Sequence, residues 1–112
     1  MKPRQPELVD VSMKALKSDD DTQGIVVIVI GNSSNDPVSA PLVVESNVPL
    51  EFWHDGKKLA PGPVAVVSIP ARIPRLSNKA FEIQWKDATD EIKFIHMRAR
   101  FKTRRSRDVE IG

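Results

Sequence analysis

Apolar and polar residues alternate along much of this 112-residue chain, and the period of the alternation predicts strands. In residues 7–17 (ELVDVSMKALK) the odd-numbered positions from Val9 to Ala15 are apolar, which is typical of a half-buried strand. A helix also fits this segment, since apolar residues recur there every three or four positions, but the strand is the preferred interpretation. The polar segment KSDDDTQG that follows indicates a turn.

The most apolar stretch is IVVIVI at residues 25–30, which stands between Gly24 and Gly31. It is short and wholly β-branched, and such residues favour a pleated backbone over a helix. A run without alternation is typical of a strand whose two faces are both covered, at least in part, so we expect a central strand. The next residues, GNSSNDP, are rich in turn formers and predict a loop.

The dipeptide Asp55-Gly56 predicts a β-hairpin, because this pair is favoured in a two-residue type I′ turn. Residues 50–54 (LEFWH) would enter the turn and residues 57–59 (KKL) would leave it. The surrounding elements follow from apolar runs and from prolines: a short strand in APLVVES (40–46), the end of the hairpin in APGP (60–63), a strand in VAVVSI (64–69) and its end in PARIPRL (70–76).

The last third of the chain contains two more segments with one apolar face. In KAFEIQWKD (79–87) the apolar face consists of Phe81, Ile83 and Trp85. The turn KDATDE separates this segment from IKFIHMRARFK (92–102), and we expect the two strands to pair as a second hairpin.

The segment 92–102 changes phase near its beginning. Its odd-numbered residues from Ile95 to Phe101 are apolar, whereas Ile92 and Phe94 are in the opposite phase. A bulge near Phe94 or Ile95 would switch the faces and account for this change.

These segments amount to about seven strands and no convincing helix, which indicates an all-β fold. We expect one antiparallel β-sandwich in a single domain over residues 1–112, with an N-terminal arm (1–6) and a basic C-terminal tail (103–112). A small β-barrel is the alternative. The chain contains no cysteine, so neither a disulfide nor a thiolate zinc site exists, and its nine prolines disfavour a helical bundle.

The order of these features resembles immunoglobulin-like and fibronectin type III-like sandwiches. It is similar in particular to the bacterial modules named for cell-adhesion-related domains, through the pieces Gly31–Ser34, His54–Lys57, Ala60–Gly62 and Phe81–Phe101. The antibody-type pair of cysteines is absent, and there is no tyrosine to form a tyrosine corner. The resemblance implies a fold and no particular ligand.

Motifs for chemistry are absent from the sequence. His54 and Asp55 are neighbours on an expected strand, so their side chains would point to opposite faces, and His96 belongs to a solvated strand face. Two histidines without cysteine, and without a carboxylate at ligand spacing, do not make a zinc site. We expect no catalytic residue, no metal, no cofactor and no enzyme.

The beginning of the chain, MKPRQPELVD, lacks the apolar core of a signal peptide, and the longest apolar run has six residues. About 20 residues are needed to span a bilayer as a helix, so no transmembrane segment is expected. A cytoplasmic location is favoured unless the chain is a fragment of a longer protein.

The hairpin tip is the candidate for protein contact, through Trp53, His54, Asp55, Gly56 and Lys57. Trp53 shares a face with Glu51 and is expected to be exposed, whereas Trp85 shares a face with Phe81 and Ile83 and is assigned to the core. The motif NSS at residues 32–34 matches a glycosylation acceptor, and a loop is the preferred interpretation.

The C-terminal part is strongly basic and is the candidate for anion binding. Alternate positions of a continued last strand would form a cationic row, and the tail would extend it: Arg98, Arg100, Lys102, Arg104, Arg105 and Arg107. Such a row can neutralise phosphates, but it can also serve only to discourage edge-to-edge pairing, and the sequence places no aromatic residue on this face for stacking on bases.

Three functional hypotheses therefore remain open after the sequence alone. The first is a non-enzymatic module that binds another protein, or a second copy of itself, through loops, the hairpin tip or a sheet edge. The second is a domain that binds nucleic acid or anionic membrane phosphates through the cationic row. The third is a structural component of a virus or phage particle.

Overall fold

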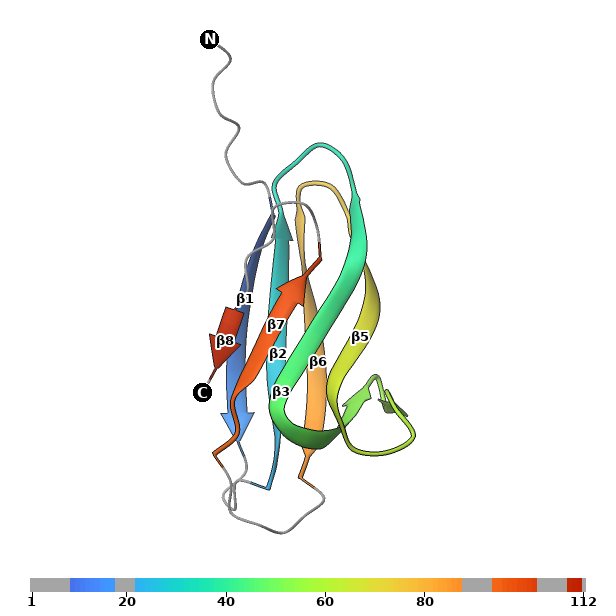
Figure 1. Ribbon diagram of the computed structural model, residues 1–112. Coiled ribbons are helices and arrows are strands. Elements are labelled where there is room, and N and C mark those ends of the chain that lie inside the picture. Colours follow the sequence, from blue (N-terminus) through green and yellow to red (C-terminus); the bar gives the residue numbers. More distant parts are fainter. Residues whose placement is uncertain (1–8, 18–21, 88–93, 103–108, 112) are drawn as a thin grey trace.

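A computed structural model of the chain describes residues 9–17, 22–87, 94–102 and 109–111 (Figure 1). The described residues form strands and no helix, and every pair of strands is antiparallel. The all-β prediction is thus confirmed. The strands are β1 (Val9–Lys17), β2 (Gln23–Asn32), β3 (Val38–His54), β4 (Lys57–Lys58), β5 (Val64–Ile73), β6 (Ser77–Lys86), β7 (Met97–Phe101) and β8 (Val109–Ile111).

Hydrogen bonds connect all these strands in the order β1-β2-β6-β3-β7-β8, and β4 and β5 also pair with β3. In Figure 1, β1, β2 and β6 lie behind β3, β5 and β7, so the connected strands form a back part and a front part. The interpretation of 7–17 as a strand is confirmed by the pairing of β1 with β2. β2 lies between β1 and β6, as expected for a central strand.

The strand β3 belongs to both parts, and here the sequence prediction of two short strands is wrong. β3 runs without interruption for 17 residues. Its first half pairs with β5 and β7, and residues 51–54 pair with β6 in the back part. The register with β5 shifts between Glu45 and Leu50, where the strand bends from one part to the other. In the sequence, Asn47 and Pro49 suggest that a strand ends here, but both residues lie inside this bend of β3.

The strand predicted for residues 64–69 is also longer than expected, because β5 continues through Pro70 to Ile73. Pro70 lies opposite Pro41 of β3. Since neither proline has an N–H group, this is a non-hydrogen-bonded pair, and the missing donor of Pro70 is directed away from β3. A proline is tolerated in such a place on an edge strand and makes that edge a poorer template for further pairing.

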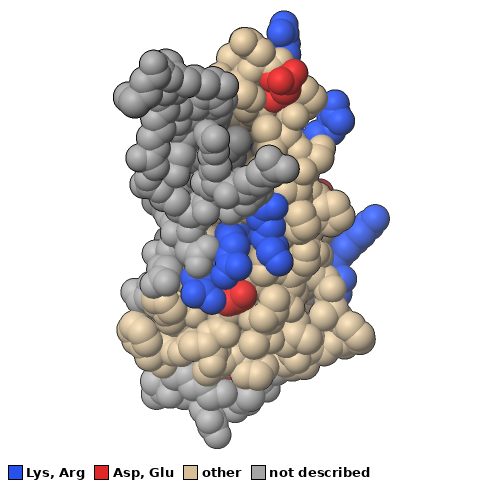
Figure 2. Space-filling model, turned by 45° about the horizontal axis from the view of Figure 1, so that its top comes forward, with Lys and Arg blue, Asp and Glu red and all other residues tan. Residues whose placement is uncertain are grey.

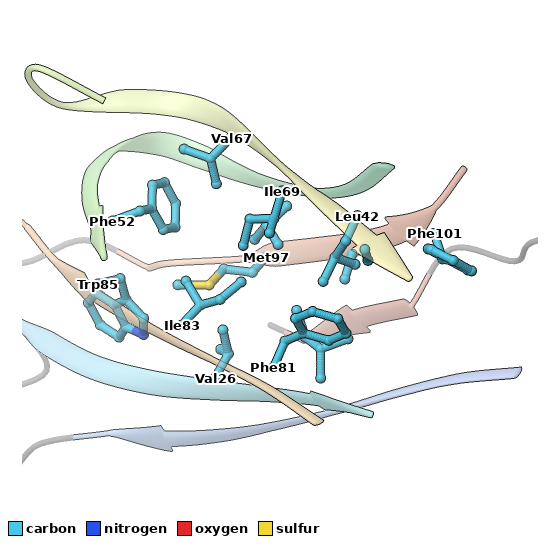
Figure 3. Packing of buried hydrophobic residues seen from close by; sticks show 14 of the residues in the cluster. Val26, Leu42, Phe52, Val67, Ile69, Phe81, Ile83, Trp85, Met97 and Phe101 are labelled. Carbon is cyan, nitrogen blue, oxygen red and sulfur yellow. The ribbon is translucent and has the colours of Figure 1, made fainter. Parts of the chain in front are cut away.

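The predicted second hairpin is wrong. β6 pairs with β2 and β3, whereas β7 pairs with β3 and β8. The alternation in both segments identified the inward residues correctly, but those residues meet across the core instead of side by side in one sheet (Figure 3). The linking turn, which was expected at 86–91, lies mostly outside the described residues.

The core fills the space between the front and back parts (Figure 3). Alternate residues of β2, β5, β6 and β7 supply it, which is the pattern expected of strands with one buried face. Trp85 is in the core, as predicted. The buried hydrophobic residues are Val26, Ile28, Ile30, Leu42, Val44, Leu50, Phe52, Val67, Ile69, Ala71, Ile73, Phe81, Ile83, Trp85, Ile95, Met97, Ala99 and Phe101.

One end of the molecule is closed by Asn32, which is buried although it is polar. Its amide nitrogen donates to the carbonyl oxygens of Asp36, Ile73 and Pro74 at 2.8–3.2 Å. Its Oδ1 accepts from the backbone N–H and the hydroxyl of Ser34. This one side chain therefore holds the β2–β3 loop against the β5–β6 connection. Asn32 belongs to the NSS motif but is the last residue of β2, so the loop interpretation of that motif is confirmed only for Ser33 and Ser34.

Candidate interaction surfaces

The hairpin tip has the predicted turn. Asp55 and Gly56 both have positive φ angles, 52° and 76°, as a type I′ turn requires. The register places Trp53 opposite Lys58 and His54 opposite Lys57. The side chains of alternate hairpin residues therefore point to opposite faces of the back part.

His54 is directed toward the edge of the core. Its ring centroid is 6.0 Å from that of Phe81, and its Nδ1 is 3.2 Å from the carbonyl oxygen of Glu82. The expectation that His54 and Asp55 point apart is wrong, because His54 Nε2 is 3.3 Å from Asp55 Oδ2. The positive φ of Asp55 turns its carboxylate back toward the preceding residue. Both ring nitrogens thus face oxygen atoms of the hairpin and of β6.

Trp53 lies on the outer face of the back part beside Glu51, but it is half-buried, whereas an exposed side chain was expected. The Nζ atom of Lys58 lies 5.8 Å from the centroid of the Trp53 ring and 2.8 Å from Glu51 Oε1. Lys58 therefore contacts both the indole of Trp53 and the carboxylate of Glu51, while part of the indole stays exposed.

The outer face continues from Trp53 across β6 to β2. Trp53 is opposite Gln84, and Gln84 is opposite Ile25 on its other side. Ile25 and Val27 are half-buried, because they point away from the core. We call the surface formed by Trp53, Ile25, Val27, Gln84 and Lys58 the Trp53 surface.

The opposite, front face carries the predicted cationic row, as far as the structure describes it. Arg98 and Arg100 are half-buried and Lys102 is exposed, alternating with buried residues. Arg98 Nη2 is 2.5 Å from Oε2 of Glu45 on β3, so one charge of the row is balanced by a neighbour. Figure 2 shows Lys and Arg side chains gathered around an acidic side chain on this face. Arg104, Arg105 and Arg107 lie outside the described residues.

The sequence missed Phe94, which is the most exposed large hydrophobic residue described, at 73%. A bulge within the strand was expected here, but β7 begins only at Met97, and Ile92 lies outside the described residues. The side chain of Asn47 on β3 takes the place of a strand partner instead. It donates to the carbonyl oxygen of Phe94 and accepts from the N–H of His96, both at 2.8 Å.

Two shallow hollows occur among the described residues. One, of about 110 Å³, is lined by Glu45, Ser46, His96 and Arg98 and lies on the front face. The other, of about 300 Å³, lies at the end closed by Asn32 and is lined by Gly31, Asn32, Ser33, Leu76, Ser77 and Asn78. Leu76 in the second hollow has a positive φ of 50° and is 60% exposed. Its N–H donates to the carbonyl oxygen of Ser34, which fixes this conformation.

Comparison of the chain with models of protein families gives no match, and a search of curated proteins finds no similar sequence. The described ranges contain no helix long and apolar enough to cross a membrane. Within those ranges, no three His, Asp or Glu side chains come together in a way that could hold a metal ion. The function must therefore be argued from the surfaces themselves.

Proposed function

We propose that this chain is an immunoglobulin-like β-sandwich and works as a non-enzymatic assembly module that contacts a second copy of itself. The sandwich is supported by the front and back parts, which face each other over one core (Figure 3). The order of loop, hairpin and closing strands also supports it. The chain differs from antibody domains in lacking their cysteine pair and in the strand β3, which is shared by both parts.

The observation that carries the proposal is the half-exposed Trp53 of the Trp53 surface. Tryptophan is the residue type most often found as the energetic centre of a protein interface, where it fills a pocket of the partner. Ile25 and Val27 provide apolar neighbours, and polar groups surround them, which is the usual composition of such a contact.

A second copy is the partner that the charges favour. The outer face around Trp53 carries Lys58 and Lys86 together with Glu51 and Glu82, so positive and negative side chains balance. A balanced face does not repel its own copy, and a two-fold axis can bring each lysine against a glutamate.

The two tryptophans provide a direct test, since Trp85 is 3% exposed and only Trp53 is open to a quencher. Static light scattering should show a molar mass that rises with protein concentration, and acrylamide quenching of Trp53 should fall in parallel. Trp53→Ser should stay monomeric. Val66→Ser, which removes an exposed apolar residue from the front part, is the matched control and should behave as the unaltered chain.

A monomeric mass and constant quenching at every concentration would refute self-assembly. If Trp53→Ser still associates, the contact between the copies does not lie on the Trp53 surface.

A further inference from the structure

We propose that the front face binds single-stranded nucleic acid along β7 and the residues just before it. The residues are Phe94, His96, Arg98, Arg100 and Lys102, which we call the β7 row. This inference goes beyond the proposed self-assembly and concerns the opposite face of the molecule, so each can fail without the other.

The β7 row is a continuous line of outward side chains. From residue 94 to residue 102, exposed or half-buried positions alternate with the buried residues Ile95, Met97, Ala99 and Phe101. Side chains on one face of an extended strand are about 6.8 Å apart, so the row is about 27 Å long. A row that is one side chain wide and extended suits an extended single strand.

Phe94 provides an aromatic ring for stacking on this face, where the sequence predicted none. Its backbone is fixed by Asn47 through Phe94 O and His96 N, and the backbone N–H of Asn47 donates to His96 O at 3.0 Å. The residue is 73% exposed, so the core does not account for its presence. Bases stack on such rings with little dependence on sequence.

The charges beside Phe94 have the sign that phosphates require. On the outward positions of the front part that the structure describes, in β5, in residues 38–46 of β3, in β7 and at Lys102, the charged residues are Arg72, Arg98, Arg100, Lys102 and the single acid Glu45. The described charges of the front face are therefore mainly positive.

An exposed aromatic ring beside a cationic row favours single-stranded nucleic acid over a duplex or an anionic membrane. Bases in a duplex are already stacked on each other, and the flat face of β7 offers no element to enter a groove. An anionic membrane would accept an aliphatic side chain at position 94 as readily as an aromatic one, whereas stacking requires the ring.

The test is the fluorescence anisotropy of a labelled 12-nucleotide oligothymidylate with the full chain at 50 mM salt. Binding should weaken with salt, and log K against log salt should have a slope of about −1.4 if the two cations Arg100 and Lys102 contact phosphates. Phe94→Leu should weaken binding about 10-fold and Phe94→Trp should retain it. Arg100→Glu should weaken binding at least as much as Phe94→Leu. Lys57→Glu, at the distant hairpin tip, is the matched charge control and should change it little.

Glu45→Gln provides a test in the opposite direction. The carboxylate of Glu45 is one partner of the Arg98 guanidinium and lies beside the row. Its removal takes a negative charge from the front face, so affinity should rise and the salt dependence should become steeper. A variant that only loosened the fold would lose affinity.

Absence of binding at 50 mM salt would overturn the proposal. Equal affinity of Phe94→Leu and the unaltered chain would also do so, as would equal or stronger binding to a duplex of the same length. Stronger binding to phosphatidylserine vesicles than to the oligonucleotide would assign the row to a membrane surface instead.

Discussion

The two outer faces of the molecule are built from similar strands, yet their side chains differ in kind. Around Trp53 on the back face, apolar residues are surrounded by lysines and glutamates in balance. Along β7 on the front face, arginine and lysine predominate and an exposed phenylalanine lies at one end. The inward residues of both parts are alike, because one apolar core selects them.

This difference shows where the information about function resides. Inward positions are fixed by packing and would look the same in many β-proteins. Outward positions are free of that demand, so an apolar centre or a uniform sign of charge on them needs another reason. A balanced apolar face fits a protein partner, whereas a cationic face with an aromatic ring fits a polyanion.

The largest loss of stability should come from a substitution in β3, the strand that both faces share. Phe52 is 1% exposed and lies on β3 where this strand pairs with β6 in the back part. Phe52→Ala should lower the free energy of unfolding by about 3–5 kcal/mol, since a large cavity remains. Urea unfolding followed by tryptophan fluorescence measures this.

Phe94→Ala is the control for Phe52→Ala and should change the stability by less than about 0.5 kcal/mol, because Phe94 is exposed. A small effect of Phe52→Ala would mean that the two faces do not depend on a common core.

The second largest effect should come from Asn32, which connects the loops that lead from one part to the other. Asn32→Ala removes the hydrogen bonds of this side chain to three carbonyl oxygens and to the N–H and hydroxyl of Ser34. Pro74 O keeps the hydrogen bond from Ser77 Oγ, and Asp36 O keeps that from Ser34 Oγ. We expect a loss of about 2–3 kcal/mol, because buried polar groups lose their hydrogen bonds. Asn35→Ala, in the exposed part of the same loop, should cost less than about 0.5 kcal/mol. Equal effects of the two variants would contradict the role of Asn32.

The sequence predicted where strands lie along the chain, but not which strands pair with each other. Alternation identifies the buried face of a segment, and it did so for Phe81–Trp85 and for Ile95–Phe101. It does not say which strand lies alongside, and for that reason the second hairpin was wrong. Prolines predict ends of strands, yet Pro41 and Pro70 pair with each other within long strands, because neither has to donate a hydrogen bond to the other.

The candidate sites show the same division between local and distant signals. The hairpin tip was predicted because Asp55-Gly56 is a local signal for a turn. The exposure of Phe94 was not predicted, since it depends on Asn47, which is 47 positions away in the chain. The balance of Arg98 by Glu45 likewise joins residues of two strands that only the fold brings together.

A smaller effect, limited to the back face, should follow from Gly56→Ala. The φ of 76° at Gly56 is unfavourable for alanine, although no atom lies within 4 Å of an added Cβ. The cost is therefore conformational and should be about 1 kcal/mol of stability. Gly62→Ala is a matched control, because that Cβ also meets open space and its φ is not positive. It should leave the stability unchanged or raise it slightly. A loss in Gly62→Ala as large as in Gly56→Ala would contradict the type I′ turn as the cause.

The smallest loss of stability should come from Lys58→Gln. This variant tests whether the exposure of Trp53 can change while the stability of the fold is nearly kept. Lys58 contacts both Glu51 and the ring of Trp53, but its side chain is 39% exposed, so solvent weakens both interactions. We expect a loss of only about 0.5 kcal/mol, together with easier acrylamide quenching of Trp53 as its ring is released. Lys57→Gln, on the other face of the same hairpin, should change neither quantity. If Lys58→Gln left the quenching of Trp53 unchanged, the lysine would not be what holds the indole in place, and the Trp53 surface would depend on β6 and β2 alone.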